Sequence, residues 1–181
     1  MDLGETLDVA TREEWRGWLE RNHDSKKEIW LVYHRKASGR PRISYDEAVE
    51  EALCYGWIDS TVKNVDEASF AQRFTPRTPG RRISEMNKER IRRLLAEGKM
   101  TPAGIAAAGE FESTPEMAPD ILAALRRDPQ TWANFEQFPE YYRNIRVAFV
   151  EGARKRPAEF RRRLDHLVEM TAKGKMFGMV K

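Results

Sequence analysis

A change of pattern near Ser84 constrains the fold more than any other feature of this chain. Before it, three runs of β-branched and aromatic residues are too short and continuous for amphipathic helices and are typical of strands. These runs are Glu28–Arg35, Trp57–Val65 and Ser69–Thr75. After it, apolar residues recur three and four positions apart, which is the period of an α-helix. The sequence therefore predicts an α+β protein whose strands all lie in the first half.

Two capping boxes mark where the helices of the first half begin. Thr11 is followed by Glu14, and Ser44 by Glu47. In this motif the hydroxyl and the carboxylate satisfy free amides of the first turn. Gly56 is expected to end the second helix. The predicted order is α-β-α-β-β, a small three-stranded antiparallel sheet with flanking helices on one side.

The second half is expected to be a C-terminal helical bundle. Pro139 should separate two of its helices, and Asp120 should cap a helix from Ile121 to Arg127. Further helices are predicted over 84–98, 101–108, 129–138, 140–152 and 157–173, with a frayed tail over 174–181. The loop predicted over 112–119 is the best boundary between two subdomains. We expect an α+β subdomain over 1–111 and a helical subdomain over 112–181 packed on it, or else one continuous domain.

Composition narrows the class of protein. The 181 residues are 40% hydrophobic and 34% charged, which indicates an ordered globular chain rather than a disordered one. One cysteine excludes an intrachain disulfide and a cysteine zinc cluster. The acidic N-terminus is not a secretory signal, and no apolar run is long enough to span a membrane. We therefore expect a cytoplasmic protein. No metal-binding spacing or cofactor loop is present, so neither a metal nor a cofactor is expected.

The net charge of +3 comes from two basic clusters. Residues 73–93 and residues 143–163 each contain eight basic and two acidic residues. If they shared a face, they would attract anions, nucleic acid included. Two solvated helix faces would explain the same pattern.

The run Ala52–Arg77 is dense in groups that could do chemistry. Cys54 falls at the C-terminal end of its helix, where the helix dipole raises the pKa of a thiol, so we expect it to be a buried packing residue. Trp57 and Asp59 share one face of their strand by the two-residue period. Asp59 is expected to contact Arg73 or Arg77 across the hairpin. Such a pair would either fix the sheet or present an arginine to an anion.

The exit from this run suggests an anion site. Ser84 should cap the following helix, whose free amides and dipole favour an anion. Asn87 lies one turn further on, and Arg77 supplies a positive charge. The candidate ligand-binding set is Trp57, Asp59, Arg73, Arg77, Ser84 and Asn87.

An ordered set of motifs carries a resemblance to a family. The motifs are WLVYHRKASG, ISYDEAVEEALCYGWIDS, QRFTPRTP and GKMTPAG. Together they resemble the bacterial and archaeal YdeI/OmpD-associated proteins, also called bacteriocin-protection proteins, from Trp15 to Met170. In this chain Arg81 replaces a serine and Ile83 a tryptophan of the family pattern. The resemblance implies association with tolerance to antimicrobial peptides, and it implies no established reaction.

Three functions follow as hypotheses. The first is a non-enzymatic binding or stress-tolerance protein whose cleft takes a small anionic or peptide ligand. The second is a nucleic-acid-binding module that uses the clusters 73–93 and 143–163, although exposed aromatics do not alternate with the basic residues on a strand. The third is an enzyme of unknown reaction with Asp59 as general base.

Overall fold

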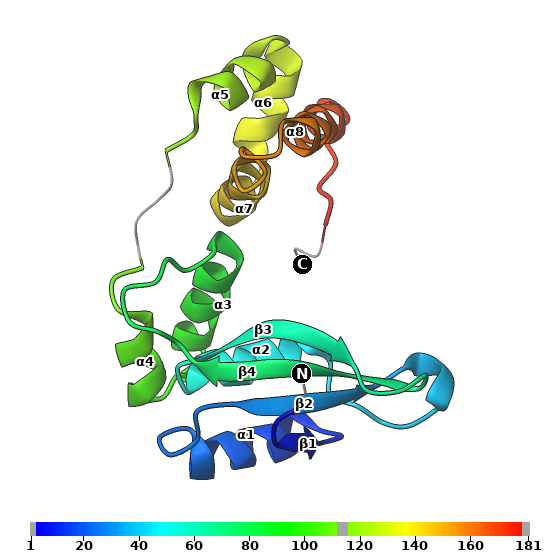
Figure 1. Cartoon of the computed structure of the whole chain (residues 1–181). Coiled ribbons are helices and arrows are strands. Elements are labelled where there is room, and N and C mark those ends of the chain that lie inside the picture. Colours follow the sequence, from blue (N-terminus) through cyan, green and yellow to red (C-terminus); the bar gives the residue numbers. More distant parts are fainter. Residues whose placement is uncertain (1–2, 112–115, 179–181) are drawn as a thin grey trace. The chain divides into compact units, whose positions relative to one another are not determined.

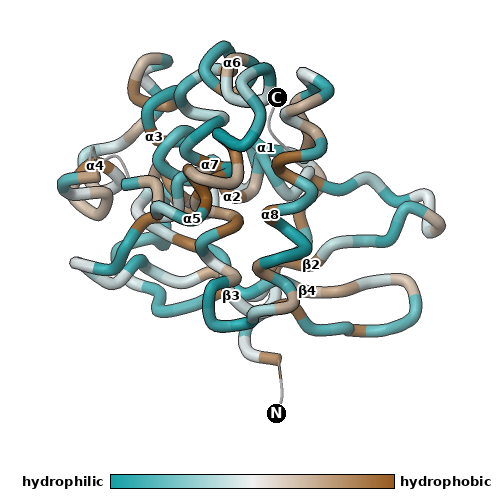
Figure 2. Tube along the Cα trace, turned by 90° about the horizontal axis from the view of Figure 1, so that it is seen from above, coloured by the Kyte–Doolittle hydropathy of each residue, from teal (hydrophilic) through white to brown (hydrophobic). Residues whose placement is uncertain are grey.

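The computed structural model describes residues 3–111 and 116–178, and these divide into two compact units. The first unit comprises Met1–Ile83 and Arg90–Phe111, and the second comprises Ser84–Glu89 and Glu112–Lys181. Figure 1 labels the helices and strands of each unit. The expected loop over 112–119 lies partly outside the described residues. In both units hydrophobic stretches alternate with hydrophilic ones along the chain (Figure 2), as expected of elements that bury one face.

The sheet of the first unit has four strands in the order β1-β2-β4-β3. Their bounds are β1 Thr6–Asp8, β2 Ile29–His34, β3 Trp57–Asn64 and β4 Ser69–Pro76. β1 runs parallel to β2, and the other neighbours are antiparallel. The prediction of three antiparallel strands was wrong in this detail. β1 was not predicted, because a strand of three residues is too short to show the two-residue alternation of a strand.

One face of the sheet carries the core of the first unit. The register places Ile29, Leu31 and Tyr33 of β2 opposite Phe74, Gln72 and Phe70 of β4. Helices α1 (Arg12–Asn22) and α2 (Tyr45–Cys54) pack on this face. The Trp15 indole lies 5.4 Å from the Phe74 ring and donates a hydrogen bond to the Ala48 carbonyl at 3.0 Å.

The capping boxes form in different ways. Ser44 and Glu47 complete both hydrogen bonds of the box at the start of α2. At α1 the Thr11 hydroxyl accepts from the Glu14 amide at 3.2 Å, but the Glu14 carboxylate accepts from the Ala10 amide instead. After α2, Gly56 adopts a φ of +74° and turns the chain into β3, as expected. The remaining short helices are η1 (Lys36–Ser38), α3 (Glu85–Ala96) and α4 (Pro102–Ala108).

The second unit is a set of helices around its own hydrophobic core. Its bounds are α5 Pro119–Arg126, α6 Pro129–Gln137, α7 Glu140–Glu151 and α8 Pro157–Ala172. Asp120 does not cap α5 as predicted, because Pro119 begins the helix and Ala118 takes the capping position. The Asp120 carboxylate instead pairs with Arg154 at 2.8 Å.

The C-terminal tail is anchored at one residue of its described part. The Phe177 amide donates to the Tyr142 hydroxyl at 3.0 Å, and its ring lies 4.5 Å from that of His166. The tail predicted to fray over 174–181 is therefore packed at Phe177, its other described residues are exposed, and residues 179–181 lie outside the described residues. None of the helices in the described part of the chain is long and apolar enough to cross a membrane.

Candidate functional site

The first unit contains a cavity of about 410 Å³ at one end of the core face of the sheet. Its size suits a small molecule. It is lined by Tyr33, Arg42, Tyr45, Val62, Phe70 and Gln72. We call this cavity the tyrosine pocket. Its lining comes from β2, from the loop before α2, from the first turn of α2 and from the β3–β4 hairpin.

A β-bulge in β3 shapes one wall of the tyrosine pocket. Asp59 pairs with Phe74, whereas Val62 pairs with Gln72. Between these two pairs β3 therefore contains one more residue than β4, which is a β-bulge. A regular strand would place Asp59 and Val62 on opposite faces. With the bulge, both lie on the face of Gln72.

Asp59 is held beside the pocket by two donors. Its Oδ2 accepts hydrogen bonds from the Tyr45 hydroxyl at 3.0 Å and from the Gln72 amide at 2.7 Å. Its Oδ1 accepts no hydrogen bond from any described residue. The capping box at Ser44 places Tyr45 at the first position of α2, which brings its hydroxyl to this carboxylate. One carboxylate oxygen is thus committed to the protein and the other is available.

Tyr33 brings an unsatisfied hydroxyl to the same pocket. The side chain is 1% exposed, and its ring stacks on Phe70 at 5.2 Å. The Oη atom is buried and has no hydrogen-bond partner in the part of the chain that the structure describes. Burial, reinforced by the negative charge of Asp59, raises the pKa of Tyr33, and the same two causes raise the pKa of Tyr45 to about 12. Both tyrosines are therefore neutral donors at physiological pH.

Arg42 supplies the positive charge of the tyrosine pocket. The residue is exposed, and its Nη1 donates to the His34 carbonyl at 3.0 Å. No carboxylate of a described residue forms an ion pair with it. An arginine with free donors beside aromatic walls can bind a carboxylate or a phosphate in bidentate fashion. Arg42 was not predicted as a site residue, because it lies in the loop before α2 and outside the motifs of the family pattern.

The predicted site residues of the hairpin lie elsewhere. Trp57 does share a sheet face with Asp59, but it is 1% exposed in the core, where its indole donates to the His23 carbonyl at 3.0 Å. Arg73 pairs with Glu28 through a hydrogen bond of 2.9 Å from its Nε. This contact lowers the pKa of Glu28. The expected ion pair between Asp59 and Arg73 or Arg77 is therefore wrong, because other partners hold these groups.

The predicted anion site is divided between the two units. In the first unit, Arg77 donates to the carbonyl of Arg81, and burial together with the charge of Arg81 lowers the pKa of Arg77. In the second unit, Ser84 caps α3 by accepting from the Asn87 amide at 3.3 Å. The joint site of Arg77, Ser84 and Asn87 therefore stays a prediction.

Cys54 is a packing residue, as predicted. The side chain is fully buried, and burial raises the pKa of the thiol to about 11, with a further contribution from the negative charge of Glu51. At neutral pH the thiolate form is scarce, so Cys54 is a poor nucleophile. Its carbonyl accepts from the Thr101 hydroxyl at 2.6 Å, which fixes the start of α4 against the end of α2.

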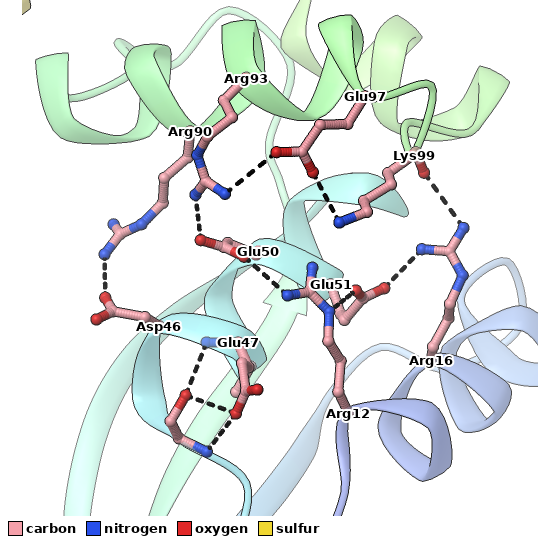
Figure 3. Close-up of polar contacts among 12 residues, drawn as sticks. Arg12, Arg16, Asp46, Glu47, Glu50, Glu51, Arg90, Arg93, Glu97 and Lys99 are labelled. Carbon is pink, nitrogen blue, oxygen red and sulfur yellow. Dashed lines mark hydrogen bonds and ion pairs between the residues drawn. The ribbon is translucent and has the colours of Figure 1, made fainter. Parts of the chain in front are cut away.

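A second polar constellation joins α1, α2 and α3 in the first unit (Figure 3). Glu51 accepts from Arg12 and, at 2.6 Å, from Arg16. Glu50 accepts from Arg12 at 3.0 Å and also from Arg93. Burial disfavours the charged forms of Arg12 and Arg16, but hydrogen bonds and attraction to Glu51 outweigh it and raise the pKa of both.

This network is best understood as structural, although the buried Nη2 of Arg12 has no hydrogen-bond partner among the described residues. Both glutamates are buried, and each already binds two guanidinium groups. Residues 3–111 and 116–178 contain no group of three His, Cys, Asp or Glu side chains placed to hold a metal ion.

Comparison with known families assigns the two parts of the chain to different family models. Residues 7–107 match the model described as Domain of unknown function (DUF8412), and residues 114–174 match the model described as Bacteriocin-protection, YdeI or OmpD-Associated. The second match confirms the resemblance drawn from the sequence, over a shorter range than Trp15–Met170. The quoted motifs themselves fall within the first match.

The comparison with curated proteins and the comparison with solved structures found no match. The family assignment therefore rests on the two family models. Residues 114–174 match the YdeI or OmpD-Associated model. Because the first model covers more than half of the chain, this protein belongs to the family described as Domain of unknown function (DUF8412).

Proposed function

We propose that this protein binds a small aromatic acid in the tyrosine pocket and acts by binding rather than by catalysis. One observation carries the proposal: the buried, unpartnered Tyr33 hydroxyl and the carboxylate-free Arg42 guanidinium line the same cavity. A buried donor without a partner costs about 1–3 kcal/mol. A ligand that accepts from it recovers that cost on binding.

The lining fits the parts of such a ligand. A carboxylate would bind Arg42 as a bidentate pair. The aromatic ring would lie against Phe70, Val62 and Tyr45, of which Val62 and Tyr45 are exposed in the unliganded chain. The available Oδ1 of Asp59 would accept from an amino or hydroxyl group on the ring. The expected preference is therefore for 4-aminobenzoate over benzoate, and for both over a neutral amide.

The test is a titration with benzoate and 4-aminobenzoate followed by NMR of the Val62 methyl groups, which a bound ring would shift. Arg42→Met should weaken binding at least tenfold, which is the loss of about 1.4 kcal/mol expected for a charge-assisted hydrogen bond. Arg40→Met is the matched control, because Arg40 lies two residues away and pairs with Asp8. Unshifted Val62 signals, or equal binding by Arg42→Met, would rule the proposal out.

The cellular role follows from the description of the second family. We propose that binding in the tyrosine pocket contributes to protection against bacteriocins, and that the protein acts in the cytoplasm. The description of the family model that matches residues 114–174 and the aromatic, charged lining of the pocket support this role. Expression in a bacteriocin-sensitive bacterium should raise survival, and Arg42→Met should remove the gain. Equal survival with and without the protein would reject the role.

Catalysis with Asp59 as general base is a second candidate, favoured by the available Oδ1 beside the pocket. It predicts turnover of a pocket ligand that Asp59→Asn abolishes while Val62 still reports binding. Binding without turnover supports the first proposal. The pocket offers no nucleophile besides the two tyrosines, whose raised pKa values keep them protonated.

Nucleic-acid binding by the clusters 73–93 and 143–163 stays an alternative prediction. Several of their arginines already bind carboxylates: Arg73, Arg93, Arg154, Arg162 and Arg163. These pairs reduce the charge that remains for phosphates. Retention on heparin that falls steeply with salt would favour this alternative.

We further propose that residues 1–111 and 112–181 are separate domains. The two family models, which end at 107 and begin at 114, support this boundary. Limited proteolysis should then cut between them and release two stable fragments. Uniform degradation of the chain would instead indicate one continuous domain.

A further inference from the structure

Two arginines of α7 in the second unit have no anionic partner in the part of the chain that the structure describes. Arg143 and Arg146 form no ion pair with any described carboxylate. The Nε atom of each is buried and has no hydrogen-bond partner among the described residues. Buried cationic groups in proteins are normally paired and hydrogen-bonded. Arg154, just after α7, shows the usual paired arrangement, because it donates to the carboxylates of both Asp120 and Glu151.

Arg146 is the more buried of the two. It is 6% exposed, and its guanidinium lies over the rings of Tyr142, Phe149 and Phe177 at 5.5, 5.6 and 5.0 Å. Burial lowers the pKa of Arg146, and the nearby Tyr142 offsets this only in part. Aromatic faces attract the cation but accept none of its five N–H groups in the way that an oxygen does. None of the N–H groups of the Arg146 side chain therefore donates to a described residue, and its Nε–H is also shielded from solvent.

The C-terminal tail passes beside this guanidinium. A Cβ atom on Gly178 would lie 2.4 Å from Nη1 of Arg146, so a larger residue here would displace the flexible end of that side chain. Gly178 adopts a φ of +84°, which other residues rarely do. Phe177 is anchored by its hydrogen bond to Tyr142. The Arg146 side chain thus lies among three aromatic rings and the tail.

We propose that Arg143 and Arg146 form a binding site for a phosphate group in the second unit. The two side chains are three residues apart on one helix, and such residues lie side by side on its surface. Two guanidinium groups match the double charge of a phosphate monoester, and their planar donors suit its oxygens. Phe149 is exposed although Arg163 lies over its ring at 3.9 Å, and the part of the ring that remains open offers a surface to the organic part of such a ligand. This site is independent of the tyrosine pocket.

The test measures thermal unfolding of the full chain in sodium phosphate and in sodium chloride at equal ionic strength. Specific binding at tenfold excess over the dissociation constant should raise the melting temperature of the second unit by about 6 °C or more. Arg146→Met and Arg143→Met should each remove the difference between the two salts. Arg161→Met is the matched control, because Arg161 is exposed on α8 and should leave the difference unchanged. Equal melting in both salts would overturn the proposal.

A second measurement covers the case in which a variant fails to fold. In the unaltered protein, phosphate should shift the Nε–H NMR signals of Arg143 and Arg146 and leave that of Arg161 in place. Phenyl phosphate should bind more tightly than inorganic phosphate if Phe149 contributes, and an equal affinity would confine the site to the free anion. If the signals of all three arginines moved together, or if none moved, the site would be refuted. Arg146 would then be a purely structural cation.

Discussion

Tyr45, the first residue of α2, donates a hydrogen bond at 3.0 Å to Asp59, which lies just before the bulge of β3. This contact ties the start of a helix to a sheet irregularity fourteen residues later in the chain. The negative charge of Asp59 also acts on the ionisation of Tyr45. Burial raises the pKa of Tyr45 first, and the negative charge of Asp59 adds to it, up to about 12.

The coupling gives a prediction at alkaline pH. Because the pKa of Tyr45 in the folded chain lies above the ordinary value of 10, its contribution to stability is complete below pH 10 and is lost as the pH rises through 12. Asp59→Asn should lower the pKa of Tyr45 but not return it to 10, since burial remains. The measurement is the tyrosinate absorbance of the protein against pH. Asp24→Asn, at an exposed site, is the control, and an identical change in both variants would contradict the coupling.

Tyr33→Phe should stabilise the unliganded protein and impair the proposed ligand binding. The substitution removes a buried hydroxyl that has no partner, so we expect a gain of about 1 kcal/mol in the free energy of unfolding. Tyr142→Phe is the contrasting variant, because the Tyr142 hydroxyl accepts from the Phe177 amide and its loss should cost about 1 kcal/mol. Denaturant unfolding of both variants tests this difference in sign. A loss of stability in Tyr33→Phe would mean that its hydroxyl has a partner.

The sequence predicted the local elements of the first unit well, because their signals are local. The Ser44–Glu47 capping box predicted the start of α2 correctly, because its side chains bond the free amides of the first turn. Gly56 predicted the end of α2, because glycine readily takes the positive φ that ends a helix. The three predicted strands agree with β2, β3 and β4 to within two residues. The burial of Cys54 could be predicted because it falls on the apolar side of α2.

The tyrosine pocket could not be predicted, because its geometry depends on a defect in the sheet. A two-residue period puts Asp59 and Val62 on opposite faces, and only the bulge brings them together. Arg42 and Tyr33 belong to separate segments that only the fold brings to one cavity. The predicted Asp59–Arg73 pair was wrong because strand pairing is not visible in the sequence. Glu28, just before β2, lies next to Arg73 and binds it instead.

Glu51→Gln should strongly destabilise the first unit. Glu51 is 1% exposed and binds both Arg12 and Arg16, so a neutral side chain would leave two guanidinium groups without their main partner. Removal of one partner from a buried pair costs about 3–5 kcal/mol, and the partial exposure of the arginines reduces this to about 2–4 kcal/mol. Glu13→Gln, at an exposed site on α1, should stay within about 0.5 kcal/mol.

A combined variant separates the ion network from the packing. Arg12→Met, Arg16→Met and Glu51→Met together should recover most of the stability that Glu51→Gln loses, because apolar replacement of a buried ionic cluster is often neutral. Denaturant unfolding monitored by tryptophan fluorescence measures all of these variants. If Glu51→Gln alone proved neutral, the network would contribute nothing to the joining of α1 and α2.

The same substitution, glycine to alanine, should have opposite effects at two helical positions. At Gly104 of α4, a Cβ atom would lie 2.2 Å from the Cys54 carbonyl oxygen and 2.8 Å from that of Leu53, both backbone atoms that cannot move aside cheaply. Gly104→Ala should therefore cost about 1–3 kcal/mol, as overpacking does. At Gly17 of α1 the nearest atom is the flexible end of Arg21 at 3.3 Å, so Gly17→Ala should add about 0.5–1 kcal/mol. Thermal unfolding compares the two, and a stable Gly104→Ala would show that α4 does not need this close approach to the end of α2.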